Sequence, residues 1–183
     1  PISVVLGYTQ LILDGKAGDV TELQREFIES IDEKGKSLMS LVNDFLEISR
    51  IERKAVRIEK DYFNIVELVK ETTEGLRLLA ENRHISLNFE SQQEDVQVYA
   101  DRDKLSHVFI NLIENAIKYT EEGGKIGISV AEEEGGALVS IADTGIGMSE
   151  EELKYIFDMY RRLDNAEKKK IKGTGLGLAI VKE

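Results

Sequence analysis

The chain has 183 residues, of which 42% are hydrophobic, so it is long enough for one or two domains with packed cores. Its formal net charge of −11 argues against a nucleic-acid partner, because a surface of this sign repels phosphates. The absence of cysteine excludes disulfides, thiolate nucleophiles and cysteine-ligated zinc, and no apolar run approaches the roughly 20 residues that a membrane span requires.

Two helices are predicted at the start of the chain. Apolar residues recur at helical spacing from 2 to 13, and Thr21 is the expected cap of a second helix that reaches about Glu52. Alternating steps of three and four residues, with Gly35 filling one gap, connect Ile28, Ile31, Leu38, Val42 and Phe45. This spacing is typical of a heptad seam.

The second helix would extend roughly 48 Å at 1.5 Å per residue, which is too long for one short partner helix to cover its seam. Two hairpins from two copies make a four-helix bundle, so we expect a homodimer. The alternative is a monomeric hairpin packed on its own second domain. The charged run from Ile51 to Lys60 interrupts the seam, which predicts a hairpin domain over 1–53, a linker over 54–60 and a second domain over 61–183.

The second domain mixes helical and strand patterns. A helix capped by Asn64 is expected to reach about Glu81, with an inner face formed by Ile65, Leu68, Val69, Leu76 and Leu79. Alternating residues predict short strands at 85–89 and 96–98, and a β-hairpin that turns at Gly135-Gly136 between 126–130 and 138–142.

Asp101 is expected to begin a further helix, whose buried side comprises Leu105, Val108, Phe109, Leu112 and Ile113. Together these elements predict an α+β sandwich, in which helices cover one face of a sheet.

The stretch from Asn111 to Thr120 carries polar residues that a buried helix does not need. Asn111, Asn115 and Lys118 are spaced four and three residues apart, so they share one face of the predicted helix. Such a face could hold a metal ion and a phosphate, or it could be the solvated face of an amphipathic helix.

Two glycine motifs follow. Asp143-Thr-Gly-Ile-Gly147 ends the predicted hairpin, where a carboxylate can accept a hydrogen bond from a ligand amino group and glycines let the backbone approach a flat ring. The same residues also occur in ordinary turns. Gly173-Thr-Gly-Leu-Gly-Leu178 leads into a helical stretch, which favours an anion site made of backbone N–H groups. Its spacing fits neither the dinucleotide fingerprint nor the P-loop.

Between the glycine motifs, a helix is expected from Glu150 to about Phe157. A lysine-rich segment over 164–172 follows it and is either a mobile lid or a solvated loop.

In order and spacing, four motifs resemble the N, G1, F and G2 boxes of sensor histidine kinases. They are Asn111-x-x-x-Asn115-Ala-x-Lys118-Tyr119, Asp143-x-Gly145-x-Gly147, Phe157-x-x-Tyr160 and Gly173-x-Gly175-x-Gly177. The helical hairpin resembles that family's dimerisation and histidine-phosphotransfer domain, so the likeness covers essentially the whole chain. It implies the Bergerat ATP-binding fold for the second domain, with ATP and Mg²⁺ as cofactors.

The resemblance also implies roles for single residues. Asp143 would bind the adenine amino group, and Tyr119 would lie against the ring. Asn115 would coordinate Mg²⁺, with Asn111 supporting the same site. Phosphate charge would be neutralised by Lys118 together with Arg161 or Arg162, which is the main catalytic task in phosphoryl transfer. The other expected ATP-binding residues are Gly145, Gly147, Phe157, Tyr160, Gly173, Thr174, Gly175, Leu176 and Gly177.

Asn111 favours transfer over hydrolysis. The related ATPases resemble one another in placing a glutamate at this position to activate water, whereas an amide cannot act as a base. Glu114 is adjacent to Asn115 in the sequence, but one residue along a helix turns the side chain by about 100° around the axis, so we expect Glu114 to be solvated.

The family's phosphoacceptor box, His-Asp/Glu-x-x-x-Pro, would end at Pro1, so the acceptor histidine is expected just upstream of this sequence. His84 and His107 lack that box and are expected to be structural or on the surface. At the other end, the chain is expected to stop before the last helix and strand of the fold.

The resulting hypothesis is the cytoplasmic core of a two-component sensor kinase. It would phosphorylate a histidine on its own homodimer and pass the phosphoryl group to an aspartate of a response-regulator receiver domain. Any membrane attachment would come through parts that precede this sequence. Two alternatives remain: an ATP-gated clamp or ATPase of the same fold superfamily, and a non-catalytic dimeric scaffold.

Overall fold

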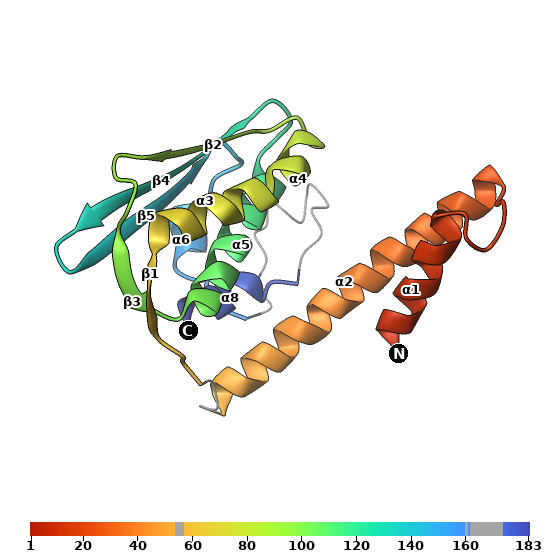
Figure 1. Cartoon of the computed structure of the whole chain (residues 1–183), viewed down its shortest axis with the longest axis horizontal. Helices are drawn as coiled ribbons and strands as arrows, with labels where there is room; N and C mark the ends of the chain where they lie inside the picture. Colours follow the sequence, from red (N-terminus) through yellow and green to blue (C-terminus); the bar gives the residue numbers. More distant parts are fainter. Residues whose placement is uncertain (54–56, 160, 162–173) are drawn as a thin grey trace. The chain divides into compact units, whose positions relative to one another are not determined.

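The computed structural model describes residues 1–53, 57–159, 161 and 174–183. It divides the chain into two compact units, Pro1–Ala55 and Val56–Glu183 (Figure 1). Within the described ranges, no helix combines the length and the apolar character that crossing a membrane would require.

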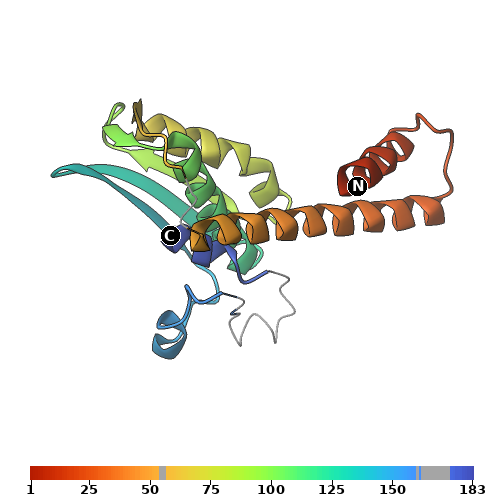
Figure 2. The ribbon, with the colours of Figure 1, turned by 90° about the horizontal axis from the view of Figure 1, so that it is seen from below.

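The first unit is an antiparallel helical hairpin. Helix α1 spans Ile2–Leu13 and α2 spans Glu22–Glu52, as predicted, and Figure 2 shows α1 folded back along the N-terminal half of α2. A reciprocal capping box starts α2: the Thr21 N–H donates to Gln24 Oε1 at 2.9 Å, and the Gln24 N–H donates to Thr21 Oγ1 at 3.3 Å. These bonds confirm the predicted helix start.

The two hairpin helices meet at Thr9 and Asp32. The Thr9 hydroxyl donates to Asp32 Oδ1 at 2.9 Å, and Lys36 pairs with Asp32 Oδ2 at 2.7 Å. Three residues away on each helix, Leu6 packs on Gly35, where a β-carbon would lie 2.7 Å from Leu6 Cδ2. Many large apolar side chains of the hairpin nevertheless stay exposed in the single chain: Val4, Val5, Tyr8, Leu11, Leu23, Phe27, Ile31, Leu38, Leu41, Val42, Phe45 and Leu46.

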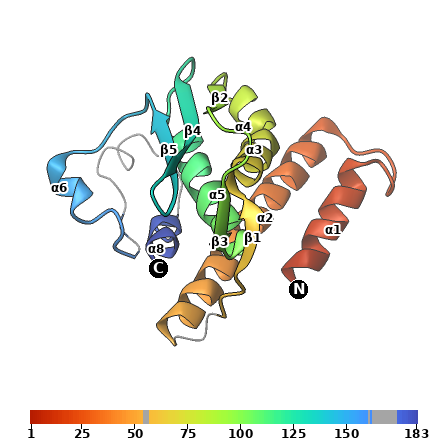
Figure 3. The same ribbon diagram turned by 60° about the vertical axis from the view of Figure 1, so that its left-hand side comes forward.

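The second unit combines strands and helices in layers (Figure 3). Its strands are β1 (Asp61–Asn64), β2 (Ser86–Ser91), β3 (Gln97–Ala100), β4 (Lys125–Glu133) and β5 (Gly136–Asp143). Strands β1 and β3 form an antiparallel ribbon, whereas β2 runs parallel to β4 and β4 runs antiparallel to β5. Its helices are α3 (Ile65–Gly75), α4 (Arg77–Glu81), α5 (Arg102–Tyr119), α6 (Glu150–Leu153) and α8 (Gly177–Lys182).

Helices α3 and α5 cover one face of the β2-β4-β5 sheet. Along the first part of β4, buried residues alternate with exposed ones, so only one face of the strand contributes to the core. The core comprises Ile65, Val66, Leu68, Val69, Ala80, Ile85, Leu87, Val96, Phe109, Ile113, Ala116, Ile117, Ile126, Ile128 and Val130. This arrangement confirms the predicted α+β sandwich.

One predicted helix is broken in the structure. The helix expected from Asn64 to Glu81 divides at Leu76 into α3 and α4. Gly75 is a poor helix former, and the Leu76 N–H turns back to the Thr73 carbonyl at 3.2 Å instead of continuing the helical ladder. Leu79, expected on the inner face, is consequently 43% exposed.

The helix predicted from Glu150 to about Phe157 is shorter than expected. It ends at Leu153 as α6, because the bonds that follow span three residues, as from the Tyr155 N–H to the Glu152 carbonyl at 3.0 Å. Strand β1 was not predicted, since its four residues carry too little alternation to stand out in the sequence.

Candidate nucleotide-binding site

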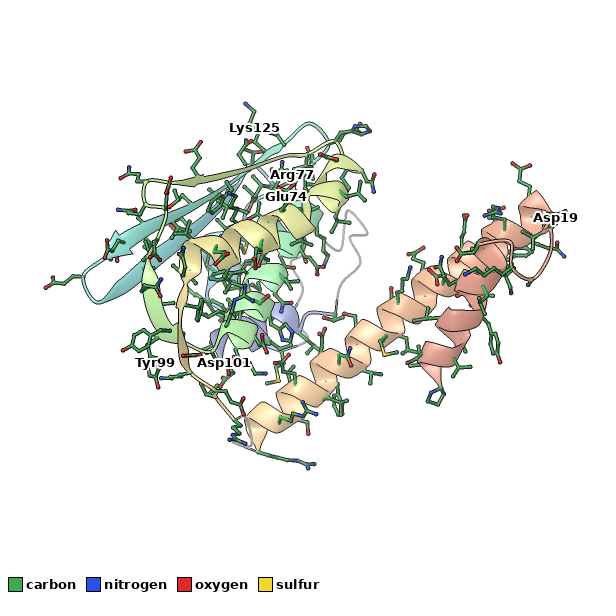
Figure 4. All side chains as sticks on the ribbon, in the orientation of Figure 1. Asp19, Glu74, Arg77, Tyr99, Asp101 and Lys125 are labelled. Carbon is green, nitrogen blue, oxygen red and sulfur yellow. The ribbon has the colours of Figure 1, made fainter. Side chains whose placement is uncertain are left out.

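Helix α5 carries the predicted polar face, and Asp101 holds its start. Asp101 Oδ1 accepts from the Lys104 N–H at 3.0 Å, and its Oδ2 accepts from the Glu59 N–H at 2.8 Å. Figure 4 shows Asp101 at this end of α5, close to Tyr99 on β3. The N–H groups of Glu59 and Lys104 hold the pKa of the Asp101 carboxyl below its usual range.

The polar residues of α5 lie half-buried beside its core-facing side. The buried residues of the helix are Phe109, Ile113, Ala116 and Ile117. Asn111, Asn115, Lys118 and Tyr119 are each partly exposed. The Asn111 amide folds back along the helix, where its Nδ2 donates to the His107 carbonyl at 3.0 Å. Its Oδ1 is thereby left to face the neighbouring helix α8.

Gly177, the first residue of α8, lies against this face. A β-carbon built on Gly177 would be 2.7 Å from Asn111 Oδ1 and 3.9 Å from Asn115 Nδ2. The preceding Leu176 is 2% exposed, and its N–H donates to Thr174 Oγ1 at 3.1 Å. The second glycine motif and both asparagines are therefore brought together, as the resemblance implied.

The first glycine motif meets the other end of α5. Asp143, the last residue of β5, is exposed and its Oδ1 accepts from the Gly145 N–H at 2.8 Å. A β-carbon on Gly145 would lie 2.6 Å from the Tyr119 carbonyl oxygen, which also accepts from the Ile146 N–H at 3.2 Å. Gly147 has a φ of +64°, a conformation that favours glycine. The loop is thus fitted onto the residue predicted to lie against adenine.

The predicted cationic residues are only partly placed. Lys118 Nζ lies 4.8 Å from the centroid of the Tyr119 ring. The Arg161 guanidinium stacks on Tyr155 at 4.4 Å, and Phe157 is 40% exposed. Three predicted site residues, Tyr160, Arg162 and Gly173, lie outside the described residues, as does the expected lysine-rich lid over 164–172.

Two residues near the site were not singled out from the sequence. Arg83, in the loop after α4, donates from Nη1 to the Ile117 carbonyl near the end of α5. Thr120 is 1% exposed, and its Oγ1 has no hydrogen-bond partner among the described residues. No sequence pattern relates Arg83 to α5, because Arg83 and Ile117 are 34 positions apart in the sequence and only the fold brings them together.

A metal ion at this site would depend on amide oxygens. In the described part of the chain, no three His, Cys, Asp or Glu side chains gather into a metal-binding cluster. Asn111 and Asn115 offer oxygen donors of the kind Mg²⁺ accepts, and the absence of a side chain on Gly177 lets the start of α8 pack closely beside them. Mg²⁺ commonly keeps waters and takes phosphate oxygens as ligands, so these residues fit a metal that arrives with a nucleotide.

Comparison with known families assigns both units. Residues 100–183 match the histidine kinase-, DNA gyrase B-, and HSP90-like ATPase, and residues 1–54 match the His Kinase A (phospho-acceptor) domain. The circadian input-output histidine kinase CikA of Synechococcus elongatus is 35% identical over 185 residues, which cover 100% of this chain and 24% of CikA. The chain spans about a quarter to a third of the length of the curated relatives it matches.

Solved histidine kinases share the fold. Full-length ShkA in complex with AMPPNP has a TM-score of 0.78 and 28% identity, covering 99% of this chain and 37% of ShkA. The catalytic domain of ThkA has a TM-score of 0.59 and 34% identity, covering 67% of this chain and 76% of that domain. ThkA in complex with the response regulator protein TrrA has a TM-score of 0.64 and 27% identity, and the match covers 93% of this chain and 52% of the ThkA chain. These likenesses confirm the predicted Bergerat fold of the second unit.

Proposed function

We propose that this chain, which belongs to the sensor histidine kinases of two-component systems, is the ATP-dependent autokinase core of such a kinase. Residues 61–183 bind ATP with Mg²⁺, and residues 1–53 form the hairpin for dimerisation and phosphotransfer. The γ-phosphoryl group passes to a histidine of the dimer and then to an aspartate of a receiver domain. The observation that carries the proposal is the meeting of α5 with both glycine motifs, Asn111 with Gly177 and Tyr119 with Gly145.

The adenine end of the site lies where β5 meets α5. The exposed Asp143 carboxylate accepts from the ligand's amino group, and its Oδ1 is oriented by the Gly145 N–H at 2.8 Å. Tyr119 lies against the ring, with its backbone fixed by the Ile146 N–H. Gly147 lets the loop backbone approach the base, and Phe157 and Tyr160 belong to the segment that follows.

The phosphate end lies where α8 meets α5. The loop of Gly173, Thr174, Gly175, Leu176 and Gly177 supplies backbone N–H groups to the phosphates, apart from the Leu176 N–H, which donates to Thr174 Oγ1 at 3.1 Å. Asn115 holds Mg²⁺, with Asn111 supporting it, and the ion supplies neutralisation of the charge on the phosphate oxygens. Lys118, Arg161 and Arg162 add positive charge at the transferred group, which is the main electrostatic contribution to phosphoryl transfer.

Asn111 directs the reaction to a protein acceptor. An amide has no proton-accepting group of suitable basicity, so it cannot activate water as a glutamate would. Its Nδ2 is already committed to the His107 carbonyl at 3.0 Å. This favours transfer over hydrolysis and counts against the ATPase alternative.

The hairpin supports dimerisation because its exposed apolar surface is large. Phe27, Ile31, Leu38 and Phe45 are each at least 48% exposed in the single chain, and contiguous apolar surface of this kind marks a protein interface. A second hairpin would complete a four-helix bundle. The complex of ThkA with the response regulator protein TrrA supports a receiver domain as the partner. Because ATP and receiver domains are cytoplasmic, we place this core in the cytoplasm.

The test uses a chain extended upstream of Pro1 to include the box His-Asp/Glu-x-x-x-Pro. With γ-labelled ATP and Mg²⁺, we expect acid-labile phosphohistidine, and transfer of the label when a cognate receiver domain is added. Asn115→Ala should abolish labelling, whereas Glu114→Gln, its neighbour on the exposed side of α5, should label like the wild type.

Other outcomes would contradict the proposal. Steady phosphate release without phosphohistidine would favour an ATPase or ATP-gated clamp. Failure to bind nucleotide at all would favour a non-catalytic dimeric scaffold.

A further inference from the structure

The end of helix α5 is held by groups from outside the helix. The last four carbonyls of an α-helix lack partners within it. In α5, the Ile117 carbonyl accepts from Arg83 Nη1 at 2.5 Å, and the Tyr119 carbonyl accepts from the Ile146 N–H at 3.2 Å. One bond comes from the loop between α4 and β2, and the other comes from the loop that follows Asp143.

Arg83 reaches α5 from a loop that is itself tied to the same place. The Arg83 N–H donates to the Ala80 carbonyl at 3.0 Å. The next residue, His84, has a φ of 54°, and its carbonyl accepts from the N–H of Gly123, in the turn after α5, at 3.0 Å. The guanidinium therefore extends from a backbone that is anchored close to the carbonyl it binds.

The charge of Arg83 suits its position. A cation near the C-terminus of a helix is stabilised by the partial negative charge there, and α5 is 18 residues long. Hydrogen bonds from an ionised donor are stronger than neutral ones. Ile117 is 1% exposed, so removing the donor would leave its carbonyl with little access to water in exchange.

We propose that Arg83 is a positioning residue for the nucleotide, acting through Ile117 on the Lys118–Tyr119 end of α5. The inference rests on the function proposed above. Tyr119 is two residues beyond Ile117, and its carbonyl is also where the loop of Gly145 and Ile146 is seated. Arg83 thus binds one carbonyl at the end of α5, and the Ile146 N–H of the Asp143 loop binds another. When Arg83 is lost, the Tyr119 ring and the adenine-binding loop shift together.

Arg77 offers a matched control. It is the first residue of α4, and its Nη1 also donates to a backbone carbonyl, that of Leu87 on β2, at 3.3 Å. Figure 4 shows it beside Glu74, with which its Nε pairs at 2.8 Å. Substituting Arg77 therefore removes a comparable arginine-to-carbonyl bond that holds a strand and not the end of α5.

The experiment measures the dissociation constant of AMPPNP with Mg²⁺ by calorimetry for the 183-residue chain. Each variant is measured at a temperature at which circular dichroism shows it folded. We expect Arg83→Met to weaken binding roughly three- to tenfold, a part of what a charge-assisted bond contributes. Arg83→Lys keeps a charged donor and should bind within about twofold of the wild type. Arg77→Met should bind like the wild type.

A double-mutant cycle separates positioning from general destabilisation. If Arg83 acts through Tyr119, the effects of Arg83→Met and Tyr119→Leu on affinity should be less than additive. Wild-type affinity in Arg83→Met, additive effects, or equal losses in the Lys and Met variants would each overturn the inference. Should Arg83→Met not fold, Arg83→Gln takes its place with the same expectations. A wild-type chain that binds no nucleotide would instead refute the proposed function.

Discussion

Asn111 Oδ1 lies 2.7 Å from the position that a β-carbon would occupy on Gly177. Real β-carbons do not approach a neighbouring atom so closely, so a side chain at residue 177 would displace the Asn111 amide from this position. The contact joins residues 66 positions apart, 177 minus 111, that belong to different motifs of the sequence. A substitution that disturbs this contact between α5 and α8 therefore tests the proposed phosphate site directly.

Gly177→Ala should weaken nucleotide binding by roughly fivefold or more, because overpacking costs about 1–3 kcal/mol and the β-carbon displaces the Asn111 amide. Titration with AMPPNP and Mg²⁺ measures the change. Gly75→Ala is the control, since a β-carbon there meets nothing within 4 Å. Unchanged affinity in Gly177→Ala would show that the α5–α8 contact does not shape the ligand site.

Asn111→Glu should raise ATP hydrolysis, because a carboxylate at this position can accept a proton from water, which the amide cannot. General-base catalysis typically contributes about 10²–10⁴-fold, so we expect steady phosphate release to rise by roughly tenfold or more even with imperfect geometry. A coupled assay for inorganic phosphate measures the rate of release. Glu114→Gln should leave the rate unchanged, and a hydrolysis rate in Asn111→Glu equal to that of the wild type would contradict the assignment.

Asp101 should make the folding stability of the second unit fall at acidic pH. The N–H groups of Glu59 and Lys104 lower the pKa of this carboxyl from 3.8 in the folded state. A lowered pKa stabilises the fold above its unfolded value, and the contribution is lost as pH falls through the folded value. Asp101→Asn should therefore melt below the wild type near neutral pH, and the difference should shrink as pH falls below 3.8 toward the lowered pKa of the folded state.

Thermal unfolding followed by circular dichroism between about pH 7 and pH 3 measures this difference. Asparagine still caps a helix well, so the variant removes the charge and keeps an acceptor. Asp61→Asn, at an exposed carboxylate on β1, serves as the control. A melting difference that stays constant across this range would rule out the titration of Asp101 as its cause.

Leu38→Glu should dissociate the hairpin dimer. Leu38 is 48% exposed in the single chain and lies on the predicted seam, so a charge there would be buried without a partner in the bundle. Light scattering coupled to gel filtration should report a monomer for Leu38→Glu and a dimer for the wild type. Ser37→Glu places the same charge on the neighbouring exposed position and should remain dimeric. A dimeric Leu38→Glu would place the interface elsewhere.

Local rules accounted for most of the elements. The caps at Thr21, Asn64 and Asp101 are each made by side-chain oxygens that accept from N–H groups of the first turn, and short-range bonds of this kind are readable from residue order. The break at Leu76 was not readable, because a helix-compatible pattern continues on both sides of Gly75. Strand β1 exists only because β3 pairs with it.

The same difference holds for the site: its motifs could be found in the sequence, whereas the contacts between them could not. The motifs from Asn111 to Gly177 were enough to predict an ATP-binding kinase fold, because their order and spacing resemble the four boxes of sensor histidine kinases. Their assembly required the folded chain: the seating of Gly145 on the Tyr119 carbonyl and of Gly177 on Asn111 depends on helix packing across long loops. Arg83 is the clearest example of a contact that the sequence does not reveal, since its partner is a backbone carbonyl, a group that every residue has. A contact of that kind leaves no mark in the residue pattern, and only three-dimensional packing selects it.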